Sequence, residues 1–544
     1  MFLDYLFMQL ARSTPENNRQ IFLLKLSELC KSVEKALIDE KEDEKNLDNQ
    51  INFICNTLDE IKKGKKELKC SFNEEWNDWY DEVGEEYNFS DPDSILDDVS
   101  AAIELLHKCL DHEQYEKGAE LAFKLSDLKI YASGDFSDET MGLRELICFD
   151  LLDIDLDKIA KDALCLAYMG SKETDRAEKM LAIMENFNFY SFSIEEILKT
   201  GSSEVNLKSF LRLWIEALAN RPAIKTDNLL EEAQNLLKDK KACLDNASRY
   251  AESHPILYRN ILEKENANPE EMLLIGLRGM KEVPIDQSIR STIASLAAKY
   301  ALKAEKRETV EYCWLEAFRT SPTILYYFQI RLYSQNWVDY ANNVRNIYLS
   351  YYDSNDFIEQ KDLAALMFFD ERFDDFIDKF MDAKDGIGWS FTFMKEGIAL
   401  MLLLLDSGKS GYLGLSEMLK IAATVCSFDI DSYSENIGLD SKTSVLRKFT
   451  EYFKMWKAQI VLPNGIDELW LGKIYQWLEL RVSAIIKANR RSCYEECAAF
   501  VAAYGEVLES RGKIGEKLRI MQQYKKDYSR RRAFHEALRT FGMK

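Results

Sequence analysis

The sequence predicts an all-α fold in which helical hairpins stack into a solenoid, and three observations support this prediction. The chain has 544 residues, whereas a single hydrophobic core stops growing near ~250–300 residues, so we expect several domains or an elongated array. Apolar residues make up 47% of the chain, which excludes wholesale disorder. Only 8 Pro and 22 Gly are present, too few for the frequent turns of a large β-sandwich or barrel.

Residues 1–93 are predicted to form an N-terminal region of long helices, including a helical hairpin, followed by a connector. Apolar residues recur at spacings of three and four in Leu47, Ile51, Ile54, Leu58 and Ile61. This spacing is typical of an amphipathic helix that packs against a neighbour. Residues 71–93 mix aromatic and acidic residues without a period, so we expect an irregular connector there. Asp93 and Ser94 suit the N-cap of a helix beginning at Ile95.

Residues 94–426 are predicted to hold the stacked hairpins, because helices of about 10–16 residues alternate with short loops. Three of these helices end alike, since in each a Pro follows five residues after Tyr250, Gly279 or Ala317. The spacings between Pro255, Pro284 and Pro322 are 29 and 38 residues. Small residues allow two helices to approach closely, and Pro ends one helix and suits the start of the next.

These three helix ends resemble the tetratricopeptide repeat, a hairpin of 34 residues that places a small residue five before a terminal Pro. The resemblance implies a right-handed α-solenoid for residues 94–426. Ala298 and Ala301 stand where the first helix of that repeat carries small and packing residues. The Trp, Gly and Tyr of the same helix are absent, and Tyr250 replaces the small residue of the first repeat.

Parts of the chain also resemble the helical region that follows the zinc finger in bacterial SWIM-type zinc-finger proteins. The residues that carry this resemblance are Leu105–Leu128, Pro255–Ile261, Ala297–Pro322 and Tyr504–Met543. The Cys-x-Cys and Cys-x-His pairs of the finger are absent, so its zinc and DNA-linked role is not implied here. The resemblance implies a bacterial source and a repeat portion that works with a separately encoded partner.

Residues 427–544 are predicted to form a C-terminal helical cap with a basic end. The last 64 residues carry 15 Lys/Arg and 7 Asp/Glu, so this segment has a net charge of +8 and the remainder carries −30. The acidic body repels phosphate backbones. The basic end is expected either to pack on the acidic body, to remain a solvated helix face, or to contact phosphates through Arg530, Arg531 and Arg532.

No constellation of residues predicts an enzyme, a cofactor or a metal. Cys109 and His112 lie three apart, but no second ligand pair lies nearby. The segment 407–411 (Ser-Gly-Lys-Ser-Gly) lacks the first Gly of a phosphate-binding loop and follows a helix rather than a strand. Asp153, Asp155 and Asp157 lack the rest of a calcium loop, so we interpret them as a helix N-cap.

The predicted function is therefore a scaffold or adaptor whose concave repeat surface binds a protein or peptide. The expected contacts are exposed residues on the first helices, namely Arg290, Lys299, Tyr326, Gln329 and Tyr333. The alternative is a regulatory protein that binds nucleic acid through its basic end. An odd number of Cys, 11, predicts a reducing cytoplasm. The longest apolar run, Ile398–Leu405, predicts no membrane span.

Overall fold

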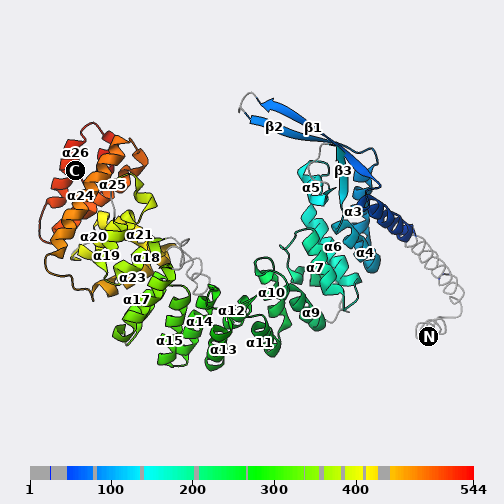
Figure 1. Cartoon of the computed structure of the whole chain (residues 1–544), viewed down its shortest axis with the longest axis horizontal. Coiled ribbons are helices and arrows are strands. Elements are labelled where there is room, and N and C mark those ends of the chain that lie inside the picture. The colour runs from blue at the N-terminus through cyan, green and yellow to red at the C-terminus, as the bar shows by residue number, and fades with distance from the viewer. Residues whose placement is uncertain are drawn as a thin grey trace. The chain divides into compact units, whose positions relative to one another are not determined.

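The chain is mostly helical in the computed structural model, which confirms the all-α prediction in its coarse form (Figure 1). The residues described are 25, 46–77, 82–134, 140–200, 207–264, 268–335, 337–353, 360–381, 386–408, 412–426 and 442–543. The first helix of the predicted N-terminal hairpin falls on residues 1–45, of which the structure describes only residue 25. The chain divides into two compact units, Met1–Asp239 and Lys240–Lys544.

The first unit combines a helix over residues 46–62 with eight further helices and four strands among its described residues. The strands are β1 (Glu67–Asn77), β2 (Glu82–Ser90), β3 (Ile130–Gly134) and β4 (Thr140–Met141). The helices are α3 (Ile95–Asp111), α4 (Tyr115–Ser126), α5 (Leu143–Cys148), α6 (Leu156–Gly170), α7 (Arg176–Asn186), α8 (Ile194–Thr200), α9 (Leu207–Ala219) and α10 (Ala223–Leu237).

The β-sheet corrects the prediction of an irregular connector over residues 71–93. The strand order is β2-β1-β3-β4, with β1 antiparallel to β2 and parallel to β3. Its base is anchored by Leu68 and Ile130, which are both fully buried. The aromatic residues of this segment favour a strand, but the acidic residues among them are disfavoured in strands, so the segment did not show a strand pattern in the sequence. The partner strand β3 begins more than fifty residues after β1 ends, so no local pattern could reveal it.

The helix starts of the first unit depend on acidic side chains. The carboxylate of Asp91 accepts hydrogen bonds from the backbone N–H groups of Ile95 and Leu96 at 2.9 and 2.8 Å. The predicted N-cap at Asp93 and Ser94 is therefore wrong in its residue, because Ser94 adopts a left-handed conformation without a side-chain cap. The predicted cap at Asp155 is confirmed, since its carboxylate accepts from the N–H of Lys158 at 3.1 Å.

The second unit is built from helices throughout its described residues. Its first half holds α11 (Lys240–Arg249), α12 (Ile256–Leu262), α13 (Pro269–Glu282), α14 (Ile289–Lys303), α15 (Arg307–Thr320), α16 (Ile324–Tyr333), α17 (Trp337–Asp353), α18 (Gln360–Phe369) and α19 (Phe373–Phe380). Its second half holds η1 (Gly388–Phe391), α20 (Met394–Leu405), α21 (Leu413–Ala423), η2 (Thr424–Cys426), α23 (Lys442–Lys457), α24 (Ile466–Lys487), η3 (Arg491–Cys493), α25 (Tyr494–Ser510), α26 (Glu516–Asp527) and α27 (Arg532–Thr540).

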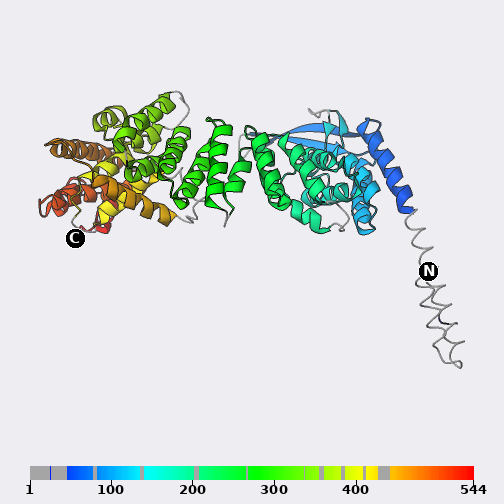
Figure 2. The same cartoon turned by 90° about the horizontal axis from the view of Figure 1, so that it is seen from below.

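Helices α13, α14 and α15 lie side by side, as the green ribbons of both views show (Figures 1 and 2). A Cβ added at Gly276 would lie 2.6 Å from the Cβ of Ala297, and one at Gly279 would lie 3.1 Å from Ile293 and Tyr258. Both glycines therefore permit the close approach that the sequence predicted for Gly279. Helices α13 and α15 end two residues before Pro284 and Pro322, as the helix-breaking role of Pro predicts.

Candidate functional site: a groove beside helix α17

A groove of about 560 Å³ runs along helix α17 in the second unit. One wall is a stripe of α17 residues spaced by four, which places them on a single helix face: Trp337, Ala341, Arg345 and Leu349. The other wall comes from α16 and from the turn between α18 and α19: Tyr327, Asp370, Glu371 and Arg372. Its volume lies in the range of pockets that bind small molecules or single side chains of a peptide.

The α18–α19 turn has a backbone conformation fixed by local hydrogen bonds. Glu371 adopts a left-handed conformation with φ of 62°. The N–H of Arg372 donates to the carbonyl of Met367 at 3.0 Å, and that of Glu371 donates to Phe368 at 3.1 Å. This pair of bonds is the Schellman arrangement that ends many helices. It turns the chain sharply, so that the three residues after Phe369 line the groove.

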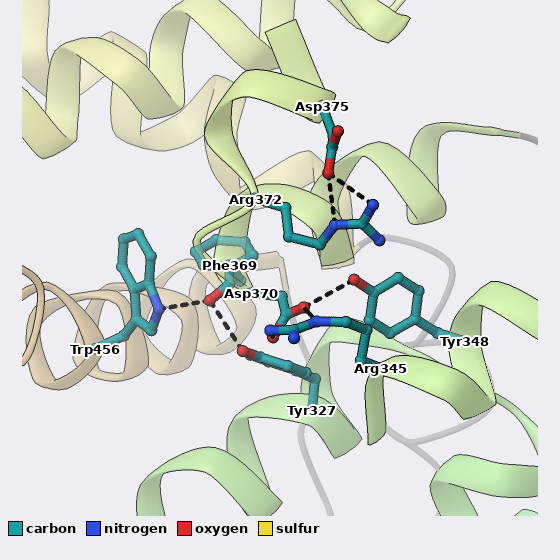
Figure 3. A network of polar contacts seen from close by, with 8 residues as sticks. All are labelled: Tyr327, Arg345, Tyr348, Phe369, Asp370, Arg372, Asp375 and Trp456. Carbon is teal, nitrogen blue, oxygen red and sulfur yellow. Dashed lines mark hydrogen bonds and ion pairs between the residues drawn. The ribbon is translucent and has the colours of Figure 1, made fainter. Parts of the chain in front are cut away.

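Two buried side chains hold the last carbonyl of α18 from different helices (Figure 3). The hydroxyl of Tyr327 on α16 and the indole N–H of Trp456 on α23 both donate to the carbonyl oxygen of Phe369 at 2.9 Å. Both donor side chains are fully buried. A carbonyl at a helix end has no partner within its own helix, so these bonds satisfy it and fix the turn against α16 and α23.

Asp370 ties the same turn to helix α17 (Figure 3). Its Oδ2 accepts from Nε of Arg345 at 2.6 Å and its Oδ1 accepts from Nη2 of Arg345 at 3.2 Å. The hydroxyl of Tyr348, one helical turn along α17, donates to Oδ2 at 2.9 Å. The Asp370 side chain is only 3% exposed. A buried carboxylate is tolerated because charge-assisted, two-pronged bonds replace its water.

The tyrosines and the arginine of this network keep their protonation states near neutral pH. Burial raises the pKa of the Tyr348 hydroxyl, and the nearby Asp370 carboxylate raises it further. Burial likewise raises the pKa of Tyr327 well above its ordinary value. The hydrogen bond to Asp370 raises the pKa of Arg345. The tyrosines therefore remain donors and the arginine remains charged throughout the physiological range.

The charges around the groove are matched in pairs. Nε of Arg372 donates to Asp375 at 2.8 Å. Arg331 lies 3.0 Å from Glu371 and stacks its guanidinium 4.8 Å above the ring of Trp337. With the Arg345–Asp370 pair, three arginines pair with three carboxylates, so the positive and negative charges around the groove cancel. Apolar contact and hydrogen bonding, rather than net charge, can therefore select a ligand there.

The five residues that the sequence predicted as partner contacts do not line this groove. Arg290 and Tyr326 are only 7% and 5% exposed, so their predicted exposure is wrong. Arg290 donates to the Met280 carbonyl at 2.9 Å and to Thr320 at 2.7 Å, which ties α14 to its neighbours. Lys299 is exposed and Gln329 is half-buried. Tyr333 is 38% exposed, with its ring 6.1 Å from that of Tyr452.

The burial of Arg290 and Tyr326 has a physical reason. Helices α14 and α16 are each covered by several neighbours, since α14 contacts α12, α13 and α15, and α16 contacts α15, α17, α18 and α23. Side chains that a single hairpin would leave exposed are therefore covered by the next helices. The groove residues could have been noticed only as the four-residue spacing from Trp337 to Leu349.

The basic end of the chain is partly neutralised and partly exposed. Arg531 donates to Asn489 at 3.0 Å. The side chain of Arg532 is 93% exposed, with a pair to Glu536 at 3.4 Å, and Arg530 is exposed. Elsewhere in this end, cations pair with carboxylates of the same end: Arg481–Glu496 and Lys517–Glu506. The exposure of Arg530 and Arg532 fits a solvated face or a phosphate contact, and these internal pairs do not test packing on the acidic body.

We also searched the described residues for a metal-binding cluster and for a membrane-spanning helix. Among the described residues no cluster of three or more His, Cys, Asp or Glu side chains could hold a metal. Burial raises the pKa of the Cys109 thiol to about 11, and His107 pairs with Asp162 at 2.8 Å. No helix within the described ranges has both the length and the apolarity to cross a membrane.

Comparison with known proteins found no matching family model, no matching curated protein and no matching solved structure.

Proposed function

We propose that this chain is a scaffold or adaptor, without catalytic activity, that binds a peptide segment of a protein partner in the groove beside α17. The observation that carries this proposal is the construction of the groove. Its walls present half-exposed aromatic and aliphatic side chains, whereas its base is held by buried hydrogen bonds to Phe369 and Asp370. A rigid site loses little conformational freedom on binding, which favours affinity.

The chemistry of the lining supports binding rather than catalysis. None of the lining residues is His, Cys or Ser, the side chains that most often act as general bases or nucleophiles. The shifted pKa values of Tyr327, Tyr348 and Arg345 move away from neutrality. A proton-transferring group works best with a pKa near the working pH.

The proposed scaffold function also implies a repeat architecture for the chain. We infer a right-handed, tetratricopeptide-like solenoid of helical hairpins over residues 94–426, in a bacterial protein of the cytoplasm. The close approach of α13 and α14 at Gly276 and the helix ends before Pro284 and Pro322 support it. Solenoids of this kind bind extended or helical peptides on their surfaces.

The binding mode that fits the groove combines one apolar anchor with flanking polar contacts. An apolar side chain of the peptide would pack against Leu349, one helical turn beyond Arg345 on α17. Backbone carbonyls of the peptide would accept from the guanidinium groups of Arg345 and Arg372 at the edges. Anchors of this kind supply most of the affinity in protein interfaces.

The test is selection of peptides from a random display library on the purified full chain, followed by calorimetric titration of the best peptide. Leu349→Arg places a charged side chain in the groove and should weaken binding at least about tenfold. Asn343→Arg adds the same charge on the opposite, exposed face of α17 and should leave binding unchanged. Equal affinity of both variants, or failure to select any peptide, would refute the groove as the binding site.

A further inference from the structure

Two turns of the C-terminal helices are strongly basic. Residues 487–493 run from the last residue of α24 to the start of α25 and contain three cations and no Asp or Glu. Residues 528–535 comprise the turn after α26 and the first turn of α27, and contain three arginines and again no Asp or Glu. In the sequence, only the arginines of the second turn stand out as a cluster, and nothing indicates that the two turns meet, because they are separated by more than thirty residues.

The fold places these two turns side by side. Nη1 of Arg531 donates to Oδ1 of Asn489 at 3.0 Å. The rings of Tyr494 and Phe534, next to the two turns, lie 5.6 Å apart in an edge-to-face arrangement. Helices α24, α25 and α26 lie close together near the C-terminus (Figure 1). We call the combined surface the C-terminal basic surface; its cations are Lys487, Arg490, Arg491, Arg530, Arg531 and Arg532.

The cations of this surface are open to solvent and largely without counter-charges. All except the half-buried Arg531 are exposed. Among the described residues, Lys487, Arg490, Arg491 and Arg530 form no ion pair, and the pair of Arg532 with Glu536 joins two exposed side chains. Pairs between exposed side chains are weak and exchange readily with another anion. Three exposed carboxylates flank the two turns, Glu495, Asp527 and Glu536, so the six cations still leave a net positive charge here in a chain of net charge −22.

The aromatic side chains near this surface point into the core instead. Phe534 is fully buried and Tyr524 is 3% exposed. Tyr528 packs against both rings, at centroid distances of 6.3 and 6.1 Å. Single-stranded nucleic acids are held by bases stacked on exposed aromatic rings. That mode is therefore disfavoured here, and so is a protein interface centred on an aromatic anchor.

We propose that the C-terminal basic surface binds the phosphate backbone of a nucleic-acid duplex. Arginine predominates in the surface, and its planar guanidinium matches phosphate oxygens with two parallel hydrogen bonds. Contacts to phosphate alone are enough for binding that does not depend on sequence. This site is independent of the peptide groove, so either proposal can fail without the other.

The test measures fluorescence anisotropy of labelled DNA and RNA duplexes of ~20 base pairs with the nuclease-treated full chain over a range of salt concentrations. If all six cations neutralise phosphates, counterions are released from the duplex. A plot of the logarithm of the affinity against the logarithm of the salt concentration should then have a slope of about −5. The double variant Arg490→Ala/Arg491→Ala should weaken binding at least about tenfold and reduce that slope by about 2. The two duplex arms show whether DNA or RNA binds more tightly.

The matched control is Lys281→Ala/Lys303→Ala, which removes the same charge from exposed residues of α13 and α14. It should retain most of the affinity. Circular dichroism of both variants should match the original chain, since all four residues are exposed. The proposal fails if no duplex binds at low salt, or if the two double variants lose affinity equally. Competition by polyglutamate as effective as that by duplex would instead assign the surface to an acidic protein.

Discussion

The groove beside α17 and the C-terminal basic surface both depend on arginine, yet they use it in opposite ways. Arg345 donates two hydrogen bonds to a carboxylate that is 3% exposed. Arg532 is 93% exposed and has only a loose pair on its own helix. The first guanidinium is a structural connector whose charge is cancelled, whereas the second keeps its charge available for an external anion.

Burial of the partner determines this difference. Asp370 lies in a turn whose backbone is fixed by Tyr327 and Trp456, so it cannot move away from Arg345. The carboxylate of Glu536 lies on a solvated helix face and can be replaced by water at little cost. We therefore expect mutations beside the groove to lower the stability of the fold, and salt to have little effect there. At the basic surface we expect mutations to leave the stability unchanged, and salt to weaken binding.

The largest expected effect is on stability, at Asp370. Asp370→Ala leaves the buried hydroxyl of Tyr348 without its acceptor and Arg345 without its partner, which should cost about 3 kcal/mol of unfolding free energy. Urea unfolding followed by tryptophan fluorescence measures the loss. Asp375→Ala is the control, since that side chain is 57% exposed, and it should cost less than about 1 kcal/mol. Equal losses at both positions would show that the turn is not held through Asp370.

A smaller effect is expected at Tyr327. Tyr327→Phe removes one of the two donors to the Phe369 carbonyl but keeps the ring, so the loss should be about 1 kcal/mol. The urea midpoint provides the measurement. Tyr333→Phe should leave the midpoint unchanged, because its hydroxyl has only a weak contact to the Met455 sulfur at 3.9 Å. A midpoint for Tyr327→Phe equal to that of the original chain would show that this hydrogen bond does not stabilise the turn.

Alkaline pH should weaken the groove in a defined direction. The folded-state pKa values of Tyr327 and Tyr348 are raised above the unfolded value near ~10. Stability from their protonated hydroxyls is therefore complete below pH ~10 and is lost as the pH rises beyond it. Thermal unfolding of Tyr348→Phe should show a shallower decline between pH ~9.5 and ~11 than the original chain. Parallel declines would contradict the assignment.

The smallest expected effect on stability is at the basic surface. Arg530→Ala/Arg531→Ala/Arg532→Ala should leave the urea midpoint close to that of the original chain, since these side chains are mostly exposed. The same variant should lose the salt-dependent binding of duplexes. A large fall in stability would mean that the three arginines act as structural connectors, as Arg345 does, and would remove the contrast between the two regions.

Sequence reasoning worked where the determining interactions are local. The amphipathic spacing from Leu47 to Ile61 predicted a helix whose five apolar residues are all buried. The cap at Asp155 and the helix ends before Pro284 and Pro322 depend on neighbours within a few residues. Such features need no knowledge of tertiary structure.

It failed where distant segments meet. The pairing of β1 with β3 and the burial of Arg290 both depend on partners that the local sequence does not indicate. The groove depends on Trp456, which lies 87 residues after the carbonyl it holds. The basic surface depends on Asn489 and Arg531, which are 42 residues apart. The sequence predicted the positive charge of this end, but it could not predict that the two turns lie together.

Peptide binding beside α17 can be tested by hydrogen–deuterium exchange of the full chain with and without the selected peptide. We expect slower exchange in α17 and in the α18–α19 turn when the peptide is bound, with no change in α24 to α27. Protection confined to other helices, with α17 and this turn unaffected, would contradict binding at this site.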